Sequence, residues 1–440
     1  MHTFGCKVNT YDTGLIQKNL KQNNILARSA DDVKNKSQIH VLNTCAVTAE
    51  ATQQAVRLIR KIKSTEPLAT IVVTGCAAQV DTDIFRNLPG ADLVVANSHK
   101  GLLPQIIDQY FKGKINDKVF KSNIFKKEEL EADGGIEANH TRSFLKIQDG
   151  CNSFCTFCII PYARGKSRSI PIAQLVHKIN ELANQNVQEV VLTGVHIGDY
   201  EDIKSGKIKI FDDLIETILN NTKIQRLRLS SLEPIEVSDR LLEIFKDPRL
   251  CPHFHMSIQS ADTEVLIGMK RKYTSYDVQN SLKRIYQAIP HVFVGMDVIA
   301  GFPTETEQQF ENTYQVLVDS PWTRLHVFPY SERAGTRAAA LPQISFHVRK
   351  ERAAQLRQLS LHRFQSEALK QIGSLKKVLV LNSDTKKYSG LADDYWSVKI
   401  NAVTENELKA VRNSVQSVKI DNVSVQNSEV VLQGQWVQRA

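Results

Sequence analysis

Strands and helices alternate through the middle of this 440-residue chain, and the alternation limits the folds available to it. Short apolar runs typical of buried strands lie at residues 144–147, 189–193, 226–230, 254–258, 292–299 and 325–328. Segments with helical spacing separate them at 172–184, 212–219, 275–289 and 305–319. Six such units predict an α/β domain over residues 137–370, built as a parallel barrel or partial barrel. Its active site is expected at the carboxyl ends of the strands.

Three closely spaced cysteines follow the first of these strands. Cys151, Cys155 and Cys158 have the spacing C-x-x-x-C-x-x-C. A loop this short can direct three thiolates to one face of an iron–sulfur cube and leave the fourth iron without a protein ligand. The alternatives are three buried cysteines or a zinc loop. A structural zinc site normally has a fourth Cys or His nearby, and this loop contains none.

The first 115 residues show the same alternation, with strands expected at 39–43, 70–74 and 92–96. The pattern predicts an open, doubly wound α/β domain over residues 1–115. Cys6, Cys45 and Cys76 each come just after a predicted strand, where ligands collect in such sheets. We therefore expect these cysteines to converge. The alternative is that they are three buried structural residues.

The overall cysteine usage and charge narrow the class of protein. Seven cysteines, an odd number, favour thiolate ligands in a reducing cytoplasm over a disulfide framework. Cys251 belongs to neither set and is interpreted as a structural thiol. No apolar run is long enough to span a membrane, and no membrane partner is expected. The net charge of +9 suits a polyanionic partner without proving one.

Polar residues and glycines follow the later strands of the predicted barrel. They are Gly194, Ser231, Glu233, Gln259, Asp297 and Gly301. A polar strand end is often only a capped turn, but four such ends on one face of a barrel indicate a ligand site. Directly after the cysteine loop, Tyr162, Arg164, Lys166 and Arg168 form a basic segment. It is predicted to hold phosphates and stack a base, or else to be a solvated loop.

The remaining segments complete the chain. Residues 113–140 are rich in Lys and Glu, contain Gly134-Gly135, and are interpreted as a linker. Residues 345–372 are predicted to form one long helix. Its expected buried face consists of Ala353, Leu356, Leu359, Phe364 and Leu369.

Short β runs at 377–381, 395–400, 417–425 and 430–436 predict a small β-barrel over residues 371–440. Its expected form resembles the five-stranded oligonucleotide-binding fold. Candidate RNA contacts in it are Lys386, Lys387, Tyr388, Tyr395, Trp396 and Lys399.

The segment IQDGCNSFCTFCIIPYARGKSRS, residues 147–169, resembles the cluster loop of radical S-adenosylmethionine (SAM) enzymes. FGCKVN, LNTCAVT and VTGCAAQ, around Cys6, Cys45 and Cys76, resemble the auxiliary-cluster motifs of the methylthiotransferases within them. The resemblance implies an N-terminal methylthiotransferase domain, a partial (β/α)6 radical SAM core and a C-terminal TRAM domain that binds RNA. It also implies a few more strand residues before Met1, so that either the start of this chain is placed late or its first strand is clipped.

The resemblance further implies two 4Fe-4S clusters. One is held by Cys151, Cys155 and Cys158, and the other by Cys6, Cys45 and Cys76. The polar strand ends would then bind SAM, and Arg271 in MKRKY matches an arginine that pairs with the SAM carboxylate. The alternative for Arg271 is a surface charge. Gly5 and Gly75 are expected to allow a close approach to the auxiliary cluster, with Asn9 and Gln79 as polar groups beside it.

Among the methylthiotransferases, GCKVN, YARGKSRS and GVHIGDY most resemble the branch that acts on threonylcarbamoyladenosine in transfer RNA. That branch adds a methylthio group to C2 of adenosine 37 in the anticodon loop. SAM cleavage at the core cluster activates C2, and the auxiliary cluster carries the sulfur, which a second SAM methylates. The implied partners are transfer RNA, an external electron donor and a sulfur source, with the protein acting as a monomer.

Three other functions remain open from the sequence. Within the same family the substrate can be isopentenyladenosine-37 of transfer RNA or an aspartate of a ribosomal protein. A third alternative is a non-catalytic iron–sulfur protein that binds RNA, which would need no SAM pocket. The polar strand ends count against this last alternative.

Overall fold

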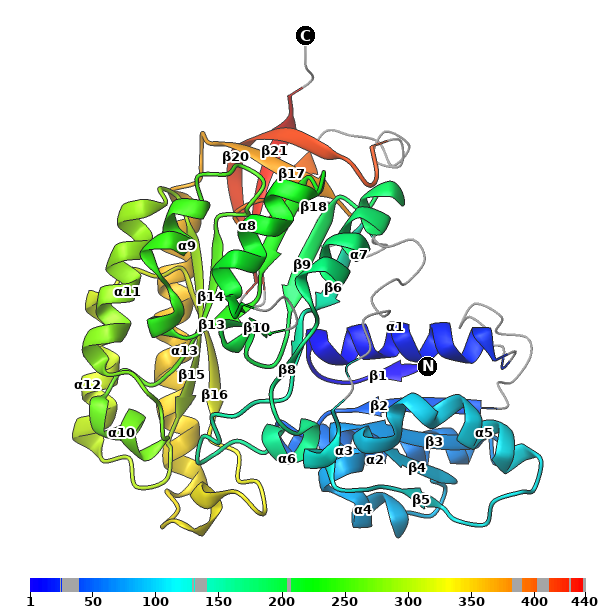
Figure 1. Ribbon diagram of the computed structural model, residues 1–440. Helices are drawn as coiled ribbons and strands as arrows, with labels where there is room; N and C mark the ends of the chain where they lie inside the picture. Colours follow the sequence, from blue (N-terminus) through cyan, green and yellow to red (C-terminus); the bar gives the residue numbers. More distant parts are fainter. Residues whose placement is uncertain are drawn as a thin grey trace.

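The computed structural model describes residues 1–23, 25, 39–128, 130, 141–203, 207–381, 390–401, 411–426 and 429–437. In these ranges the chain forms an N-terminal sheet with helices, a central array of parallel strands with helices, and a small C-terminal barrel (Figure 1). Gly134, Gly135, Lys386, Lys387 and Tyr388, singled out in the sequence, lie outside the described residues.

The N-terminal sheet is parallel, and its described strands have the order β1-β2-β3-β4-β5. The strands are β1 (His2–Thr3), β2 (Ile39–Thr44), β3 (Thr70–Gly75), β4 (Leu93–Ala96) and β5 (Val119–Phe120). The helices are α1 (Lys7–Gln22), α2 (Ala49–Thr65), α3 (Cys76–Val80), α4 (Thr82–Arg86), η1 (Asn97–Leu102), α5 (Leu103–Phe111) and η2 (Ile124–Lys126).

Helices cover both faces of this sheet. Leu42 and Ile71 pack with α2 on one face. Their strand neighbours Val41 and Val72 pack with α1 and α5 on the other face. Successive strand residues point to opposite faces, so a strand buried on both sides is apolar throughout. The predicted doubly wound architecture is confirmed.

The central strands run parallel in two sheets, β6-β9-β12 and β13-β14-β15-β16. They are β6 (Arg142–Lys146), β9 (Glu189–Thr193), β12 (Arg226–Leu229), β13 (Ser231–Leu232), β14 (His253–Gln259), β15 (Phe293–Ala300) and β16 (Arg324–Pro329). The strand predicted over 226–230 ends at Leu229, and after Ser230 the chain continues as the separate short strand β13. Because β12 and β13 are consecutive, the six strand positions form one partial barrel, as predicted.

Helices surround the central strands (Figure 1). They are α6 (Ile160–Arg164), α7 (Ile172–Asn184), η3 (Ile197–Asp199), α8 (Phe211–Asn221), η4 (Pro234–Glu236), α9 (Asp239–Ile244), α10 (Thr263–Gly268), α11 (Ser275–Ala288), α12 (Glu307–Asp319), η5 (Arg337–Ala340) and α13 (Phe346–Leu369). Short strands β7 (Gln148–Asp149) and β8 (Arg168–Ser169) pair beside the cysteine loop. A second short pair is β10 (Glu201–Asp202) and β11 (Lys209–Ile210). One apolar core fills the space between the strands and the helices.

The long helix α13 buries most of its predicted face. Ala353, Leu356 and Phe364 are buried, and Leu359 is partly buried. The prediction was wrong for Leu369, which is 58% exposed at the end of the helix, where the neighbouring Ala368 is buried instead.

The C-terminal strands β17 (Leu375–Val380), β18 (Gly390–Ala392), β19 (Ser397–Asn401), β20 (Val415–Gln426) and β21 (Glu429–Trp436) close into the predicted barrel. Two of its aromatic residues face the central domain. Trp396 is 2% exposed and stacks on Phe364 of α13, and Tyr395 stacks on His253 of β14. The expectation that Trp396 and Tyr395 stack on RNA bases was therefore wrong, because the junction between barrel and core occupies both rings.

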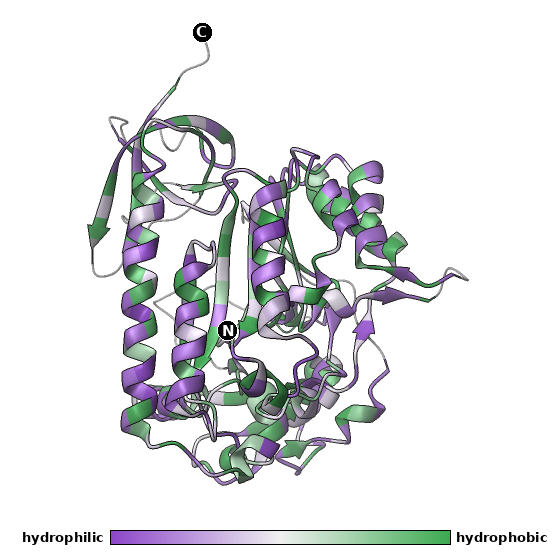
Figure 2. Ribbon diagram, turned by 90° about the vertical axis from the view of Figure 1, so that its left-hand side faces the viewer, coloured by the Kyte–Doolittle hydropathy of each residue, from purple (hydrophilic) through white to green (hydrophobic). Residues whose placement is uncertain are grey.

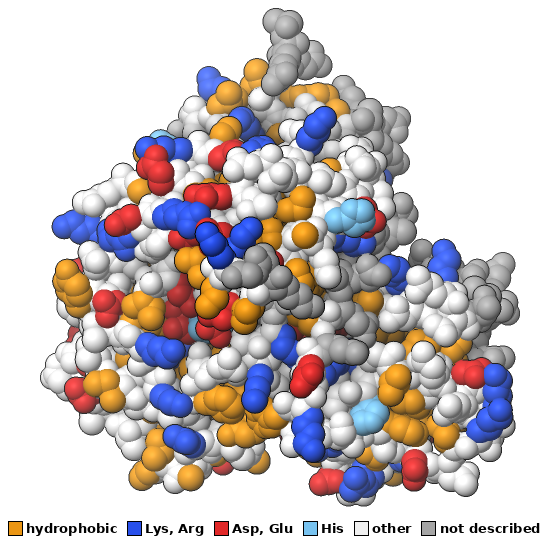
Figure 3. All heavy atoms as spheres, in the orientation of Figure 1, with side chains coloured by type: hydrophobic (Ala, Val, Ile, Leu, Met, Phe, Trp, Pro, Cys, Tyr) orange, Lys and Arg blue, Asp and Glu red, His pale blue; other side chains and the backbone are white. Residues whose placement is uncertain are grey.

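Figure 2 shows hydrophilic outer faces on the long helices around hydrophobic strands. In Figure 3, Lys and Arg side chains on the visible face are interspersed with Asp and Glu, so the positive net charge forms no single patch there. Among the described residues, no helix combines the length and apolar character that a membrane span requires.

Candidate active site

The cysteine loop after β6 is shaped by a glycine turn and by backbone hydrogen bonds. Gly150 has a φ of 76°, and the amide N–H of Cys151 donates to the carbonyl oxygen of Gly165 at 3.1 Å. Further along, the Thr156 amide donates to the carbonyl oxygen of Met269 at 3.1 Å. The backbone of the loop is thus held by hydrogen bonds on both sides.

The three thiols of this loop influence one another. Burial raises the pKa of Cys158 to about 12, and the nearby Cys155 and Cys151 add to the rise. Burial also acts on Cys151, but its neighbours His196 and Ser153 bring the pKa of that thiol below its ordinary value. The Nδ1 atom of His196 lies 3.9 Å from the Cys151 sulfur.

The N-terminal cysteines converge from three strand ends, as the topology predicts. A Cβ at Gly5 would lie 2.6 Å from the Cys45 sulfur, so the residue before Cys6 touches Cys45. Burial raises the pKa of Cys45 to about 12, with Cys76 and Cys6 contributing. Gly75 packs against Thr44 and Asn43 of the adjacent strand, and its close approach to a cluster stays a prediction.

Both cysteine trios have the donor chemistry of an iron–sulfur site. Thiolates on one tetrahedral zinc ion, with Zn–S of about 2.3 Å, lie about 3.8 Å apart. Among the described residues, no three cysteine sulfurs lie within 4.8 Å of one another. Neither trio is therefore arranged as a compact single-ion site in this structure, and three cysteine thiolates are the usual protein ligands of iron–sulfur clusters with one open iron. Cys45 and Cys158, one in each trio, are thiols whose pKa is raised by burial, and they need a cationic group beside them to be thiolates. The residues therefore fit an iron–sulfur cluster at each trio.

Polar residues at the barrel's strand ends are joined in a hydrogen-bonded chain. Ser231 Oγ lies 3.3 Å from His255 Nδ1, and His255 Nε2 lies 2.8 Å from Asp297 Oδ1. Gln259 ends β14 with a φ of 61°, a conformation that a non-glycine residue rarely adopts. Ser231, Asp297 and Gln259 remain predictions as SAM contacts.

Arg271 is not the surface charge that was one alternative, because its side chain is only 7% exposed. Its Nη1 lies 2.9 Å from Glu233 Oε1 and 3.2 Å from the Cys155 sulfur. Its Nη2 donates to the Ser257 carbonyl oxygen at 2.7 Å. The guanidinium therefore connects a strand end of the barrel to the cysteine loop.

Two predicted glycines face protein atoms at close range. A Cβ at Gly194 would lie 3.0 Å from the backbone and side-chain oxygens of Gln148. A Cβ at Gly301 would lie 2.6 Å from Arg349 Cγ of α13. Close packing against protein atoms thus explains why both positions are glycine. Their contact with SAM stays a prediction.

Several residues that the sequence did not single out complete the site. The side chain of Gln148 donates to Gly150 O at 2.7 Å and accepts from the amides of Val195 and His196 at 3.1 and 2.9 Å. It therefore ties the end of β9 to the cysteine loop. His196 lies in the motif GVHIGDY. The sequence around it gives no sign that its side chain contacts Cys151, which is far away in the chain.

His196 belongs to an ion-pair network. Its Nε2 lies 2.5 Å from Glu236 Oε1 and 3.4 Å from Glu233 Oε1. Burial alone would lower its pKa, but Cys151, Glu236 and Glu233 raise that pKa to about 11. The ligand atoms of His196, Glu233 and Glu236 lie close enough together for a metal ion, yet Arg271 already supplies positive charge to Glu233.

The remaining predicted neighbours of the cysteines fall into two groups. Asn9 is buried, and its amide donates to Phe4 O at 2.8 Å and Thr44 O at 3.0 Å, beside Cys6 and Cys45. Gln79 instead bonds to Ser98 and Ser122. The group found near Cys76 is Asn97, whose Nδ2 lies 3.6 Å from the Cys76 sulfur.

The basic segment after the loop is divided between interior and surface. Arg164 is 3% exposed, so the expectation that it holds phosphates was wrong. Tyr162 and Lys166 are exposed, and Tyr162 packs edge-on against Phe125 and Phe154. Cys251 is buried beside Arg228, Glu189 and Arg226, none of which belongs to either trio, and its role as a structural thiol stays a prediction.

Comparisons with known proteins agree with this architecture. The Radical SAM superfamily profile matches residues 145–317, and that of the Uncharacterized protein family UPF0004 matches residues 1–96. A solved radical S-adenosylmethionine methyltransferase, TsrM from Kitasatospora setae, aligns with a TM-score of 0.57 at 14% identity over 75% of this chain and 74% of that one. The fold is thus that of radical SAM proteins.

Sequence similarity to named proteins identifies the family within the radical SAM proteins. Threonylcarbamoyladenosine tRNA methylthiotransferase MtaB of Rickettsia prowazekii is 38% identical over 87% of each chain. The Aquifex aeolicus protein of the same name is 35% identical over 90% of this chain and 95% of its own. A tRNA-2-methylthio-N(6)-dimethylallyladenosine synthase of Staphylococcus epidermidis is 30% identical over 89% of this chain and 76% of its own. The chain belongs to the radical SAM methylthiotransferase family.

Proposed function

We propose that this protein transfers a methylthio group to C2 of N6-threonylcarbamoyladenosine at position 37 of transfer RNA. The observation that carries the proposal is the 38% identity, over 87% of both chains, to a relative named for this substrate. The relative named for dimethylallyladenosine is 30% identical. In the reaction, the C2 hydrogen leaves and a sulfur atom that carries a SAM-derived methyl group takes its place.

The two cysteine trios are the proposed ligands of two 4Fe-4S clusters. Cys151, Cys155 and Cys158 would hold the core cluster, and Cys6, Cys45 and Cys76 the auxiliary one. The core cluster, when bound, would pass one electron to SAM and so cleave it. The cluster would receive that electron from an external donor. Gly194, Ser231, Glu233, Gln259, Arg271, Asp297 and Gly301 are the proposed SAM contacts.

The chain's own residues would prepare this site for SAM. Arg271 places a fixed positive charge beside Cys155 and Glu233, where it can stabilise a ligand carboxylate. Gln148 keeps the loop after β9 against the cysteine loop, which limits how far the two can separate. Such preorganisation holds reacting groups at a productive distance.

Transfer RNA would approach the junction between the N-terminal and central domains, with the C-terminal barrel as an additional contact surface. Lys399 of β19 is exposed and stays a candidate for phosphate contact. Tyr162 and Lys166, exposed beside the cysteine loop, are further candidates. The sulfur atom would come from an external source, and the protein would act as a monomer in the cytoplasm.

Single-cysteine variants test the two cluster assignments. Cys155→Ala is expected to abolish formation of 5′-deoxyadenosine from SAM while it retains the iron of the auxiliary site. Cys76→Ala is expected to keep SAM cleavage and to lose the methylthio product. Cys251→Ala is the control, because its buried thiol lies outside both trios, and it is expected to keep both activities. Formation of 5′-deoxyadenosine by Cys155→Ala, or of product by Cys76→Ala, would refute the corresponding assignment.

Nucleoside analysis of transfer RNA from a deletion strain tests the substrate. The methylthio form of threonylcarbamoyladenosine is expected to disappear, and the unmodified precursor to accumulate. Loss of methylthio-isopentenyladenosine instead, or of a methylthio-aspartate in a ribosomal protein, would identify another branch of the family. A protein that binds RNA without cleaving SAM would be the non-catalytic alternative.

A further inference from the structure

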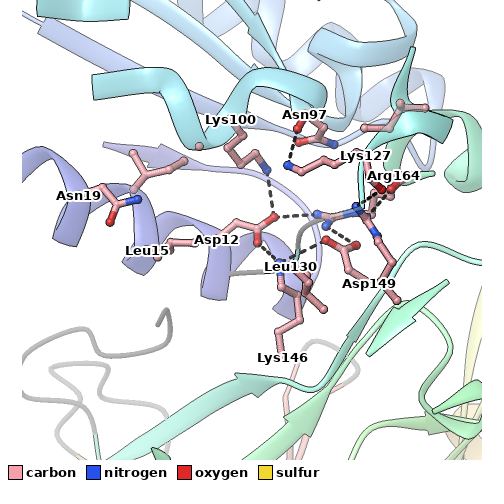
Figure 4. A pocket seen from close by; sticks show the side chains of 14 residues that line it. Asp12, Leu15, Asn19, Asn97, Lys100, Lys127, Leu130, Lys146, Asp149 and Arg164 are labelled. Atoms are coloured by element: carbon pink, nitrogen blue, oxygen red, sulfur yellow. Dashed lines mark hydrogen bonds and ion pairs between the residues drawn. The ribbon is translucent and has the colours of Figure 1, made fainter. Parts of the chain in front are cut away.

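The short helix α6 and the glycine after it lie between the two cysteine trios. Figure 4 shows Arg164 of α6 beside Asp12 of α1 and Asp149 of β7, so that one guanidinium meets both domains. Three consecutive residues, Ala163 to Gly165, make hydrogen bonds to residues that carry, precede or contact cysteines of both trios.

The first set of contacts reaches Cys6 and Cys45. Arg164 Nη2 donates to Asn9 Oδ1 at 2.6 Å. The amide group of Asn9 in turn donates to the carbonyl oxygens of Phe4 and Thr44 at 2.8 and 3.0 Å. Phe4 and Thr44 lie directly before Gly5-Cys6 and Cys45, so Arg164 acts on both loops through one buried side chain.

The second contact reaches Cys76. Asn97 Nδ2 donates to the Ala163 carbonyl oxygen at 2.9 Å and lies 3.6 Å from the Cys76 sulfur. One amide group therefore joins the backbone of α6 to the third cysteine of the N-terminal trio.

The remaining contacts reach the core trio. Arg164 Nη1 donates to Asp149 Oδ1 at 2.9 Å, and the same oxygen accepts the amide N–H of Gly150 at 2.9 Å. The Cys151 amide donates to the Gly165 carbonyl oxygen at 3.1 Å. The segment from Ala163 to Gly165 thus also fixes the start of the loop that holds Cys151.

We propose that residues 163–165 hold the two cysteine trios at a fixed separation, with Arg164 as the positioning residue that couples them. This inference rests on the proposed function. In that reaction the target base must reach both the core cysteine site and the N-terminal cysteine site while it is bound once, so the distance between the two sites matters. A misplacement of about 1 Å between reacting groups can cost about 100-fold in rate.

Arg164 can be replaced without leaving a buried charge unpaired. Asp12 would keep Lys100 at 2.9 Å and Lys146 at 2.7 Å, and Asp149 would keep Lys146 at 3.2 Å. A variant at Arg164 should therefore fold and retain its clusters. Lysine cannot substitute, because one ammonium group cannot reproduce a planar fork that meets Asn9, Asp12 and Asp149 together.

The test compares Arg164→Met and Arg164→Lys with the wild-type enzyme loaded with iron and sulfide. Both variants are expected to form 5′-deoxyadenosine at the wild-type rate and to lose about 100-fold in methylthio product, because cleavage needs one site and transfer needs both. Arg249→Met is the matched control. Arg249 also joins a carboxylate and backbone carbonyl oxygens, but within the central domain, and its variant should keep the wild-type ratio.

Hydrogen exchange of the apoprotein gives a readout independent of activity. In Arg164→Met, amides near Cys6 and Cys45 are expected to exchange faster, whereas those of α11 and α12 remain unchanged. Equal losses of cleavage and transfer, or unchanged exchange at these loops, would overturn the positioning role. If the wild-type enzyme forms no methylthio product, the proposed function fails, and the exchange result still decides whether residues 163–165 hold the loops.

Discussion

Gly150 turns the chain immediately before Cys151, in a conformation that side chains rarely adopt. Its φ is 76°, and a Cβ at this position would lie 2.0 Å from the carbonyl oxygen of Lys166. Because that neighbour is backbone, the clash can be relieved only by moving the segment after α6 or the cysteine loop itself.

Gly150→Ala is therefore expected to lose the core iron site while the N-terminal site remains. Its iron content per chain should fall to that of Cys155→Ala, and 5′-deoxyadenosine should no longer form. Gly335→Ala is the control, because Gly335 has a similar φ of 85° with no atom within 4 Å. It carries the conformational strain of about 1 kcal/mol without the clash. Full iron content in Gly150→Ala would contradict the role assigned to the turn.

At the scale of elements, β6, β9 and β12 share a buried ion-pair network. Glu189 of β9 is fully buried, 2.7 Å from Arg142 Nε, 2.8 Å from Arg226 Nη2 and 2.9 Å from Arg228 Nε. Burial alone would raise the pKa of Glu189, but these arginines hold it well below its ordinary value of 4.5. Arg226 and Arg228 also donate to carbonyl oxygens of β18, which links the barrel to the core.

Glu189→Gln is expected to destabilise the apoprotein by about 3–5 kcal/mol, because three arginines lose their shared carboxylate. Urea unfolding at neutral pH measures this change. Glu243→Gln, which alters an exposed pair with Lys246, should change the free energy of unfolding by less than about 1 kcal/mol. A loss in Glu189→Gln no larger than in this control would show that the network is dispensable.

The same network predicts how stability depends on pH. A carboxyl group whose folded pKa is depressed stabilises the folded state above its unfolded pKa, and this contribution is lost as pH falls toward the folded pKa. The wild-type apoprotein should therefore lose stability as pH falls below 4.5, more steeply than Glu189→Gln. Parallel pH profiles for the two proteins would show that Glu189 is not responsible.

At the scale of the whole molecule, the C-terminal barrel is part of the stability of the core. Phe293 of β15 and Phe364 of α13 pack in one apolar cluster with Trp396 and the barrel strands. Removal of the barrel would expose these aromatic rings and leave the donors of Arg226 and Arg228 without their carbonyl acceptors.

A chain that ends at residue 373 is therefore expected to unfold at a lower temperature and to aggregate, rather than to lose only its contacts with RNA. Differential scanning calorimetry of the apoprotein measures the shift. An unchanged unfolding temperature, with normal SAM cleavage, would show that the barrel does not stabilise the central domain. A substitution at the exposed Lys399 is the gentler probe of RNA contact, because it leaves the packed interface intact.

The sequence by itself determined the elements and the order of the cysteines. Apolar periodicity is a local property, so the central strands and helices such as 172–184 were predicted to within a few residues. The rule that parallel strands direct their carboxyl ends to one edge also brought Cys6, Cys45 and Cys76 together from far apart in the chain.

Only the tertiary structure decided which polar side chains serve the site. Arg164 and Asp12 are 152 residues apart and meet at 3.1 Å, and nothing local in either segment encodes the contact. Burial likewise decided that Arg164 and Trp396 are interior residues rather than RNA contacts, because exposure depends on which domain packs against which. Local sequence patterns thus fix where a chain can bend and turn, whereas long-range packing fixes what each charge faces.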